Sequence, residues 1–174
     1  VGAQVLAFTG PRREDYDPRD EPLLIRTLER AAELAERRQM SVMLEFMAFR
    51  GIATFEDAVR VVTAVGRPNV RICVDALHLF RSGGGLDTFS EVDPALLGCL
   101  QLCDAPLAAP PDIAREARFD RRLPGAGELP LEELLLALPA ELPVAVEAPV
   151  STEADSTPTR RAAAAAEATH AVIT

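Results

Sequence analysis

Four short apolar segments of this chain each contain a polar residue at or near their carboxyl end that can offer an oxygen ligand. The segments are VMLEF (residues 42–46), RICVD (71–75), CLQLC (99–103) and VAVEA (144–148), and the polar residues are Glu45, Asp75, Gln101 and Glu147. Apolar runs of this length, bounded by turn residues, are typical of buried strands. Side chains alternate along a strand, so Cys73 and Asp75 share one face of the second segment. Burying a carboxylate costs free energy unless a cation or hydrogen bonds compensate, so the repeated pattern indicates a shared site.

The rest of the chain alternates between predicted strands and predicted helices. Strands are expected over residues 1–8, 41–47, 71–77, 99–103 and 143–147. Helices are expected over residues 21–38, 55–65, 89–97, 130–138 and 159–170, with no element over residues 105–122 and a polar loop over residues 149–158. The second helix has the clearest limits, because Thr54 is a good N-cap and Gly66 a good helix stop. This alternation predicts a parallel sheet with helical crossovers.

The placing of the four polar groups favours a barrel over an open sheet. An open doubly wound sheet binds its ligand at a switch point between two strands, whereas here several strands direct a polar group to one end of the same face. In a barrel the inward residues converge on the axis, and the site lies at the carboxyl rim. A TIM barrel typically takes ~250 residues and eight strands, and this chain has 174 residues. We therefore predict an α/β fold, an incomplete parallel TIM barrel: a single partial domain over residues 1–174, with about five of eight βα units and the N-terminal units missing.

Composition argues against several classes of partner. The net charge is −9, every basic residue is an arginine, and no basic stripe is visible, which argues against nucleic-acid binding. No segment approaches the ~18 consecutive apolar residues of a membrane span, and no positively charged leader precedes an apolar stretch. The three cysteines, Cys73, Cys99 and Cys103, all fall in predicted strands. Buried free thiols indicate a reducing compartment, so we expect a cytoplasmic protein.

Five motifs resemble those of the xylose isomerase-like TIM barrels. They are LEF (residues 44–46), DALH (75–78), QLCDA (101–105), RLPGAGELP (122–130) and VEAP (146–149). That superfamily contains sugar phosphate isomerases and epimerases, hydroxypyruvate and inosose isomerases, dehydratases, and endonuclease IV. The resemblance aligns the chain with the fourth barrel strand onward. It implies a divalent metal ion held by Glu45, Asp75, Gln101 and Glu147.

Two positions depart from the family pattern. Gln101 stands where relatives often have histidine, although some isomerases and 3-dehydroshikimate dehydratases of the superfamily are similar in this respect. The turn at residues 124–127 has the sequence PGAG, whereas relatives often have PGEG, so Ala126 replaces a glutamate. Endonuclease IV uses a larger, histidine-rich zinc site, and this chain has only His78 and His170. The resemblance therefore disfavours the endonuclease branch and leaves the substrate open.

The resemblance also implies a reaction. Three carboxylates and one amide oxygen are hard ligands, which favour Mn²⁺ or Mg²⁺ and leave Co²⁺ or Zn²⁺ open. The metal would polarise a substrate carbonyl as a Lewis acid and stabilise an enediolate. Glu45 and Glu147 lie across the metal from each other in the family, so we expect them to remove and return the proton. At the position of His78, relatives have a residue that hydrogen-bonds the substrate or assists proton transfer.

Arginines in the segment before the RLPGAGELP motif are candidates for substrate binding. A guanidinium of Arg118, Arg121 or Arg122 could hold a phosphate or carboxylate with two hydrogen bonds. We select Arg118 and Arg121 as substrate-binding, together with His78. Asp104 is expected to orient an arginine or a metal ligand.

Each of these residues also has a plainer explanation. Glu45 or Glu147 could pair with an arginine, Gln101 could be a core amide bound by backbone, and His78 could be a capping residue. As a set they favour a divalent-metal-dependent isomerase or epimerase of a sugar, sugar phosphate or keto-polyol, without nucleic-acid or membrane partners and with a homo-oligomer left open. The alternatives are a metal-dependent lyase of the 3-dehydroshikimate dehydratase type and a non-catalytic barrel that binds a ligand.

Overall fold

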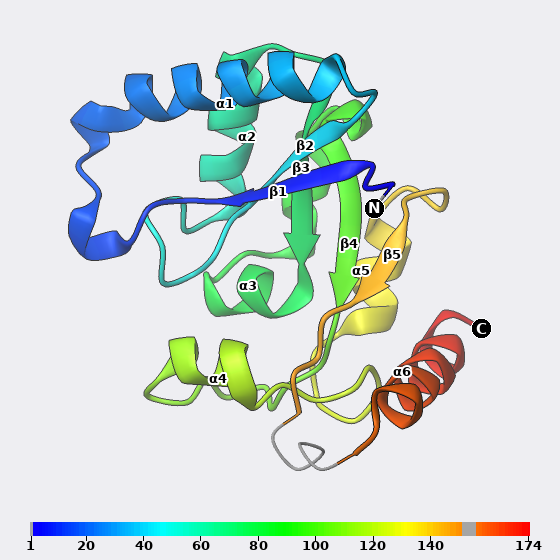
Figure 1. Ribbon diagram of the computed structural model, residues 1–174. Helices are drawn as coiled ribbons and strands as arrows, with labels where there is room; N and C mark the ends of the chain where they lie inside the picture. The colour runs from blue at the N-terminus through cyan, green and yellow to red at the C-terminus, as the bar shows by residue number, and fades with distance from the viewer. Residues whose placement is uncertain (1, 151–155) are drawn as a thin grey trace.

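The computed structural model describes residues 2–150 and 156–174 and contains one sheet of five parallel strands (Figure 1). The strands are β1 (Val5–Thr9), β2 (Ser41–Glu45), β3 (Val70–Asp75), β4 (Leu97–Leu102) and β5 (Val144–Val146). They lie side by side in chain order, and every neighbouring pair is parallel. The sheet forms half of a barrel, so the prediction of a partial TIM barrel is confirmed.

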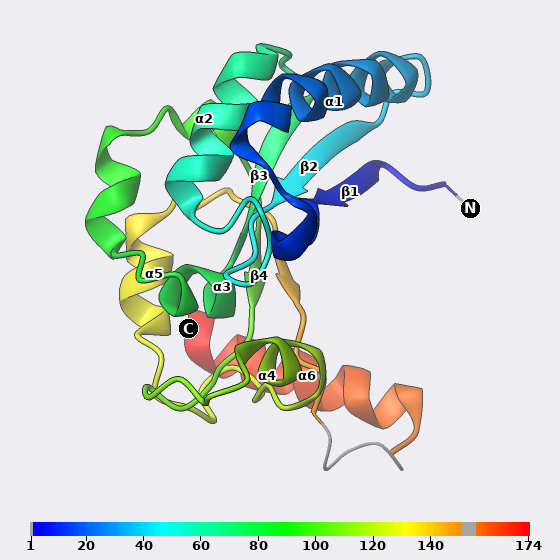
Figure 2. The ribbon, with the colours of Figure 1, turned by 90° about the vertical axis from the view of Figure 1, so that its left-hand side faces the viewer.

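The described residues form six α-helices around this half-barrel. They are α1 (Glu21–Glu36), α2 (Phe55–Val65), α3 (Ala76–Arg81), α4 (Ile113–Phe119), α5 (Leu131–Ala137) and α6 (Pro158–Ile173). Short 3₁₀ segments occur at Arg13–Asp15, Pro18–Asp20, Leu86–Glu91 and Pro94–Leu96. Figure 2 shows α1 and α2 against one face of β2 and β3, while α4 lies beyond the carboxyl ends of the strands. That end of the sheet is where a barrel carries its site.

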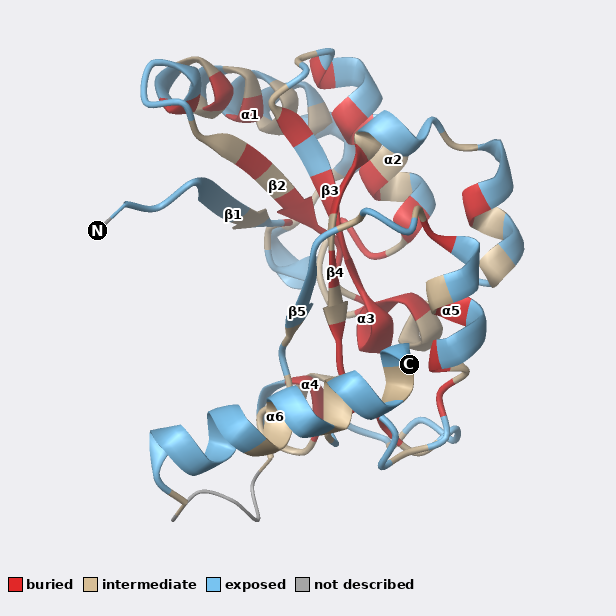
Figure 3. Cartoon of the chain, turned by 90° about the vertical axis from the view of Figure 1, so that its right-hand side faces the viewer, coloured by how far each residue is buried: buried red, intermediate tan, exposed pale blue. Residues whose placement is uncertain are grey.

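The hydrophobic core lies between the sheet and its covering helices. Alternate residues of the three central strands point outward into it and are at most 1% exposed: Val42, Leu44, Ile72, Val74, Leu100 and Leu102. The residues between them face the inside of the half-barrel, as the period of two predicts. The edge strands are less covered, and Figure 3 shows β1 and β5 mostly exposed. The central strands are therefore the best-packed part of the sheet, and they carry Glu45, Asp75 and Gln101.

The limits of α2 are those predicted. Thr54 Oγ1 accepts a hydrogen bond from the backbone N–H of Asp57 (3.1 Å), and Asp57 Oδ2 accepts one from the backbone N–H of Thr54 (3.3 Å). Gly66 ends the helix with a φ of 63°, a left-handed conformation that glycine adopts without strain. The sequence signals and the structure agree here because both caps are local interactions.

Replacing Thr54 by alanine should remove one arm of this capping box. The expected loss is about 1 kcal/mol of unfolding free energy, measurable by urea denaturation at equilibrium. Thr63→Ala, at an exposed position of the same helix, is the matched control and should leave stability unchanged or slightly higher. Equal losses from both variants would show that the cap contributes nothing beyond helix propensity.

Strand β3 ends two residues earlier than predicted. The expected strand ran to residue 77, but Ala76 begins α3. The reason is Asp75, whose Oδ1 accepts a hydrogen bond from the backbone N–H of His78 (2.9 Å) and so acts as the N-cap. The sharp turn places His78 directly above the end of the strand.

Other limits also differ from the predictions. Helix α4 lies in the segment expected to have no element, because Asp112 accepts a hydrogen bond from the backbone N–H of Arg115 (2.9 Å) and starts a helix after two prolines. The helix expected over residues 89–97 is replaced by two 3₁₀ segments, since Pro94 interrupts it. Strand β1 begins at Val5, which pairs with the first residue of β2. Residue 1 and residues 151–155 of the expected loop lie outside the described residues.

Among the described residues, no helix has both the length and the apolar content needed to cross a bilayer.

Candidate metal and catalytic site

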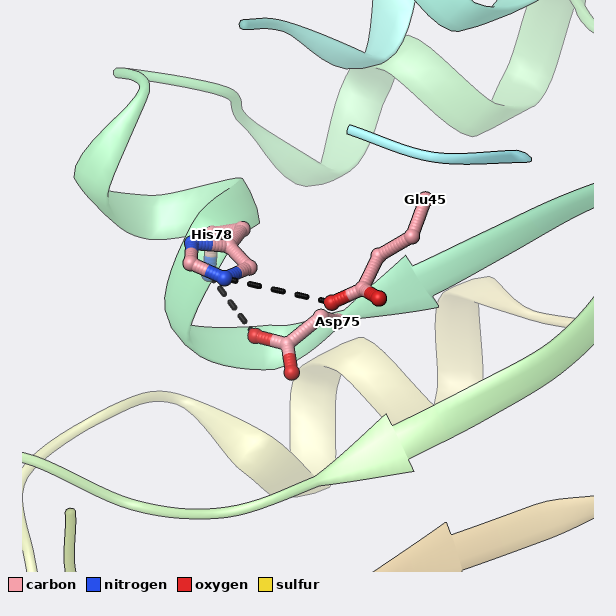
Figure 4. A group of neighbouring side chains, drawn as sticks. All are labelled: Glu45, Asp75 and His78. Carbon is pink, nitrogen blue, oxygen red and sulfur yellow. Dashed lines mark hydrogen bonds and ion pairs between the residues drawn. The ribbon is translucent and has the colours of Figure 1, made fainter. Parts of the chain in front are cut away.

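Three buried side chains meet at the carboxyl end of the sheet (Figure 4). Glu45 is the last residue of β2, Asp75 is the last residue of β3, and His78 lies in the first turn of α3. One potential ligand atom from each lies within 4.8 Å of the other two. Residues distant in sequence meet here because parallel strands end at the same edge of a sheet.

Glu45 carries a buried carboxylate oxygen that is not hydrogen-bonded. Its Oε1 has no partner among the described residues and lies 3.9 Å from Nε2 of His78. Burial raises the pKa of Glu45 to about 8, and the negative charges of Asp75 and Glu147 add to this effect, while Arg121 opposes it. A buried carboxylate beside other carboxylates is costly as an anion, and a bound cation would offset that cost.

His78 is also buried with a free ring nitrogen. Its side chain is 1% exposed, and Nε2 has no hydrogen-bond partner among the described residues. Burial lowers the pKa of His78 to about 4, against the opposing effect of Asp75, so the ring is neutral at pH 7. A neutral imidazole can offer a nitrogen lone pair to a metal ion or hydrogen-bond a substrate hydroxyl. The ring of Phe49 packs against it edge-on, with the ring centroids 5.4 Å apart.

Both carboxylate oxygens of Asp75 have partners. Oδ1 caps α3, and Oδ2 accepts a hydrogen bond from Nη1 of Arg121 (2.5 Å), whose side chain is 2% exposed. Arg121 is held in turn by the backbone oxygens of Ala117 (2.8 Å) and Glu147 (3.1 Å). Pairing with an arginine was the plainer explanation offered for Glu45 and Glu147. In the structure the arginine, Arg121, makes its shortest contact with Asp75 instead.

Gln101 and Glu147 also reach this rim, and Glu147 lies outside the group of three. Gln101 pairs with Asp75 in the register of β3 and β4, and its Oε1 accepts a hydrogen bond from the thiol of Cys73 (3.0 Å). Glu147 follows β5 directly, and its side chain is 46% exposed, with Oε2 3.9 Å from Nη2 of Arg121. The structure brings together Glu45, Asp75 and His78. The ligand roles of Gln101 and Glu147 stay predictions.

A cavity of about 700 Å³ is lined by His78 and Glu147 at this rim, while Glu45 and Asp75 lie outside its lining. Its polar and aromatic lining includes Phe49, Arg50, His78, Arg118, Arg121 and Glu147. Both arginines selected from the sequence, Arg118 and Arg121, thus border the cavity, whereas Arg122 donates to the backbone oxygen of Ala126 (3.2 Å). The sequence analysis did not single out Phe49 or Arg50. Their position in the loop after β2 is the signal for them, because barrel sites are built from the loops that follow the strands.

Asp104 serves the backbone and not a metal ligand. Its side chain is 1% exposed, and it accepts hydrogen bonds from four backbone N–H groups, those of Ala105, Gly125, Gly127 and Leu129. The expectation that Asp104 orients an arginine side chain or a ligand is not met. It fixes the turn that follows Arg121, so its influence on the site is indirect.

The residues present fit a divalent cation. Two buried atoms, Oε1 of Glu45 and Nε2 of His78, lack partners among the described residues and lie 3.9 Å apart beside the carboxylate of Asp75. Buried polar atoms are normally hydrogen-bonded, so each unpaired one calls for an explanation. Carboxylate and imidazole ligands suit Mn²⁺, Mg²⁺ and Zn²⁺ to different degrees, and the donor set alone does not select one of them.

Comparison with known proteins places these features in a family context. The family described as xylose isomerase-like TIM barrel matches residues 1–171. An inosose isomerase of Bacillus velezensis is 28% identical over 109 residues, which are 62% of this chain and 38% of that protein. A crystal structure of IOLI protein with a binding zinc atom has a TM-score of 0.88 at 22% identity, covering 99% of this chain and 63% of that one.

A second solved structure agrees. A xylose isomerase domain protein from Alicyclobacillus acidocaldarius has a TM-score of 0.76 at 27% identity, covering 99% of this chain and 64% of that one. The chain thus spans less than two thirds of the length of each of these three relatives.

Proposed function

Since the chain belongs to the xylose isomerase-like TIM barrel family, we propose that it acts in a divalent-metal-dependent isomerase or epimerase of a small sugar or keto-polyol. The reaction would move a proton at the carbon next to a carbonyl and pass through an enediolate. The inosose isomerase relative supports a sugar-like substrate. The zinc in the IOLI structure supports a divalent metal.

One observation carries the proposal. Glu45, Asp75 and His78 converge at the carboxyl rim of the half-barrel with two buried atoms unpaired among the described residues. A structural cluster would be expected to satisfy its own polar atoms, whereas a ligand-binding cluster leaves atoms free for the ligand. We propose Glu45, Asp75, Gln101 and Glu147 as the metal ligands, with His78 beside them.

The residues of this chain would divide the work as follows. Glu45 ends β2 and Glu147 follows β5, so the two residues lie on either side of β3 and β4. A base and an acid that approach from two sides can remove a proton from one carbon and return one to it or to its neighbour. A metal ion bound at the rim would supply Lewis-acid polarisation of the carbonyl. Arg121 keeps the Asp75 carboxylate in place, and neutral His78 can hydrogen-bond a substrate hydroxyl.

Solvent-isotope exchange tests this function. The protein is incubated in deuterated water with Mn²⁺ and a panel of ketoses and inososes. Deuterium should enter the recovered substrate or its isomer, as measured by mass spectrometry. Removing the metal with a chelator should slow exchange by roughly a hundredfold or more, since Lewis-acid stabilisation contributes several kcal/mol. Adding Mn²⁺ back should restore it.

Two other outcomes would redirect the proposal. A new enone or aromatic absorbance without deuterium in recovered substrate would indicate a lyase, in which a β-hydroxyl leaves after the same proton is removed. No exchange or elimination on any substrate, together with an unchanged metal content in the Glu147→Gln variant, would indicate a non-catalytic barrel. Exchange that persists undiminished in the chelated protein would remove the metal from the mechanism.

A further inference from the structure

A second, smaller cavity adjoins the one lined by His78 and Glu147. It has a volume of about 330 Å³ and is lined by Arg12, Glu14, Phe49, Arg50, Ala114 and Arg118. Three of these residues, Phe49, Arg50 and Arg118, also line the larger cavity. The two cavities therefore share one wall, and a molecule long enough can occupy both.

The backbone holds two of the arginines next to each other. Arg12 follows β1 and Arg50 follows β2, and the two residues form an isolated antiparallel bridge. The backbone N–H of Gly51 donates a hydrogen bond to the backbone oxygen of Pro11 (2.9 Å), which ties the same two loops together again. The pair thus rests on a hydrogen-bonded frame between two loops at the carboxyl rim.

Within residues 2–150 and 156–174, no ion pair neutralises the arginines of this cavity. Among the described residues, none of Arg12, Arg50 and Arg118 has a carboxylate within ion-pair distance, although Glu14 lines the same cavity. Nε of Arg50 is buried, and no described residue forms a hydrogen bond with it. Like charges held together repel each other. In a chain of net charge −9, this local excess of positive charge marks a place for an anion.

One aromatic ring, that of Phe49, lines both cavities. The ring of Phe49 packs against His78 on the side of the proposed reaction site, and the guanidinium of Arg118 lies 5.1 Å from its centroid. This cation–π contact orients Arg118 toward the boundary between the cavities. A substrate in the larger cavity, with its reacting end beside His78 and Glu147, would run past Phe49 to reach the arginines.

We propose that Arg12, Arg50 and Arg118 form an anion subsite that binds a phosphate or carboxylate group at the far end of the substrate. The substrate class is then an anionic ketose or keto-polyol and not a neutral sugar, an inference that rests on the proposed function. Guanidinium groups bind phosphate and carboxylate through paired, charge-assisted hydrogen bonds. A neutral sugar leaves these groups unpaired and gains less from binding. Arg121, which pairs with Asp75, belongs to the reaction end of the cavity.

Binding of simple anions tests the subsite without turnover. Inorganic phosphate and malonate are titrated calorimetrically into the metal-chelated protein, so that neither can bind an ion at the rim. Arg50→Gln should weaken binding of the preferred anion roughly tenfold or more, the range expected for hydrogen bonds to charged groups. Arg12→Gln and Arg118→Gln should each weaken it as well. The relative affinity for the two probes distinguishes a phosphate from a carboxylate subsite.

Arg13→Gln provides the matched control. Arg13 is the exposed neighbour of Arg12 and lines neither cavity, so its replacement should leave anion binding unchanged. The subsite is overturned if Arg50→Gln binds both probes as tightly as the unmodified protein, or if Arg13→Gln weakens binding equally.

Turnover distinguishes the subsite from the proposed function. In the isotope-exchange assay, Arg50→Gln should raise KM for a ketose phosphate or sugar acid at least tenfold more than it raises KM for the corresponding neutral ketose. Metal-dependent exchange on neutral ketoses alone, with no effect of Arg50→Gln, would retain the isomerase and reject the subsite. Anion binding that depends on Arg50, without exchange on any ketose, would support the subsite and reject the isomerase.

Discussion

Glu45→Gln is expected to lower kcat/KM of the metal-dependent proton exchange by about 10²–10⁴-fold, the contribution typical of a positioned acid or base. The amide keeps the size and shape of the side chain but can neither take up a proton nor bind a cation with a negative charge. Since Glu45 is also a proposed ligand, the metal content of the purified variant, measured by atomic absorption, should fall as well. Glu133→Gln, at an exposed position of α5, should change neither quantity.

The same variant should be more stable than the unmodified chain when metal is absent and the pH is high. Burial and neighbouring carboxylates raise the pKa of Glu45 from 4.5 to about 8 in the folded state. A raised folded pKa means that the contribution of Glu45 to stability is present below about pH 4.5 and is lost as the pH rises through about 8. The amide of the variant does not titrate in this range. The melting temperature of the variant minus that of the unmodified chain should therefore increase between about pH 5 and pH 9.

The two readouts separate a functional carboxylate from a structural one. If Glu45→Gln loses proton exchange but is more stable than the unmodified chain at high pH without metal, the carboxylate serves function and lowers stability. Lost exchange with a destabilised chain at every pH would assign Glu45 a structural role and contradict the proposal.

Local signals predicted the frame of this site well. The alternation in β2 to β4 identified which residues face the core, because burial on one face of a strand repeats with a period of two. The caps Thr54 and Gly66 gave the ends of α2, because capping depends on residues a few positions apart. The same reasoning placed Glu45, Asp75 and Gln101 at one edge of the sheet, since strands of a parallel sheet end together.

Contacts between distant segments were not predictable in the same way. Arg118, Arg121 and Arg122 lie close together in the sequence, and nothing in their spacing shows that Arg121 alone turns inward to Asp75, 46 positions earlier. That choice depends on how α4 and the turn after it pack, and α4 was itself missed. The hydrogen bond from the thiol of Cys73 to the amide oxygen of Gln101 likewise joins residues of neighbouring strands, and the sequence did not predict it.

Asp104→Ala is expected to destabilise the chain strongly although Asp104 lies outside the proposed site. The side chain accepts hydrogen bonds from four backbone N–H groups at 2.8–3.1 Å. Alanine would leave these donors unpaired in a region where Asp104 is 1% exposed. A buried donor without a partner costs about 1–3 kcal/mol. Relaxation and entering water recover part of this, so we expect a loss of about 3–5 kcal/mol in unfolding free energy by urea denaturation.

The turn that Asp104 holds also fixes the position of Arg121, so its loss should reach the site. Gly127 packs so closely on Asp104 that a Cβ there would lie 2.5 Å from the backbone oxygen of Ala105, which leaves the turn little freedom to adjust. Asp112→Ala is the matched control, because Asp112 accepts one backbone hydrogen bond at an exposed helix start and should cost about 1 kcal/mol. If Asp104→Ala costs no more than Asp112→Ala, the four hydrogen bonds do not hold the turn, and the position of Arg121 must be set by its own contacts with Asp75 and Ala117.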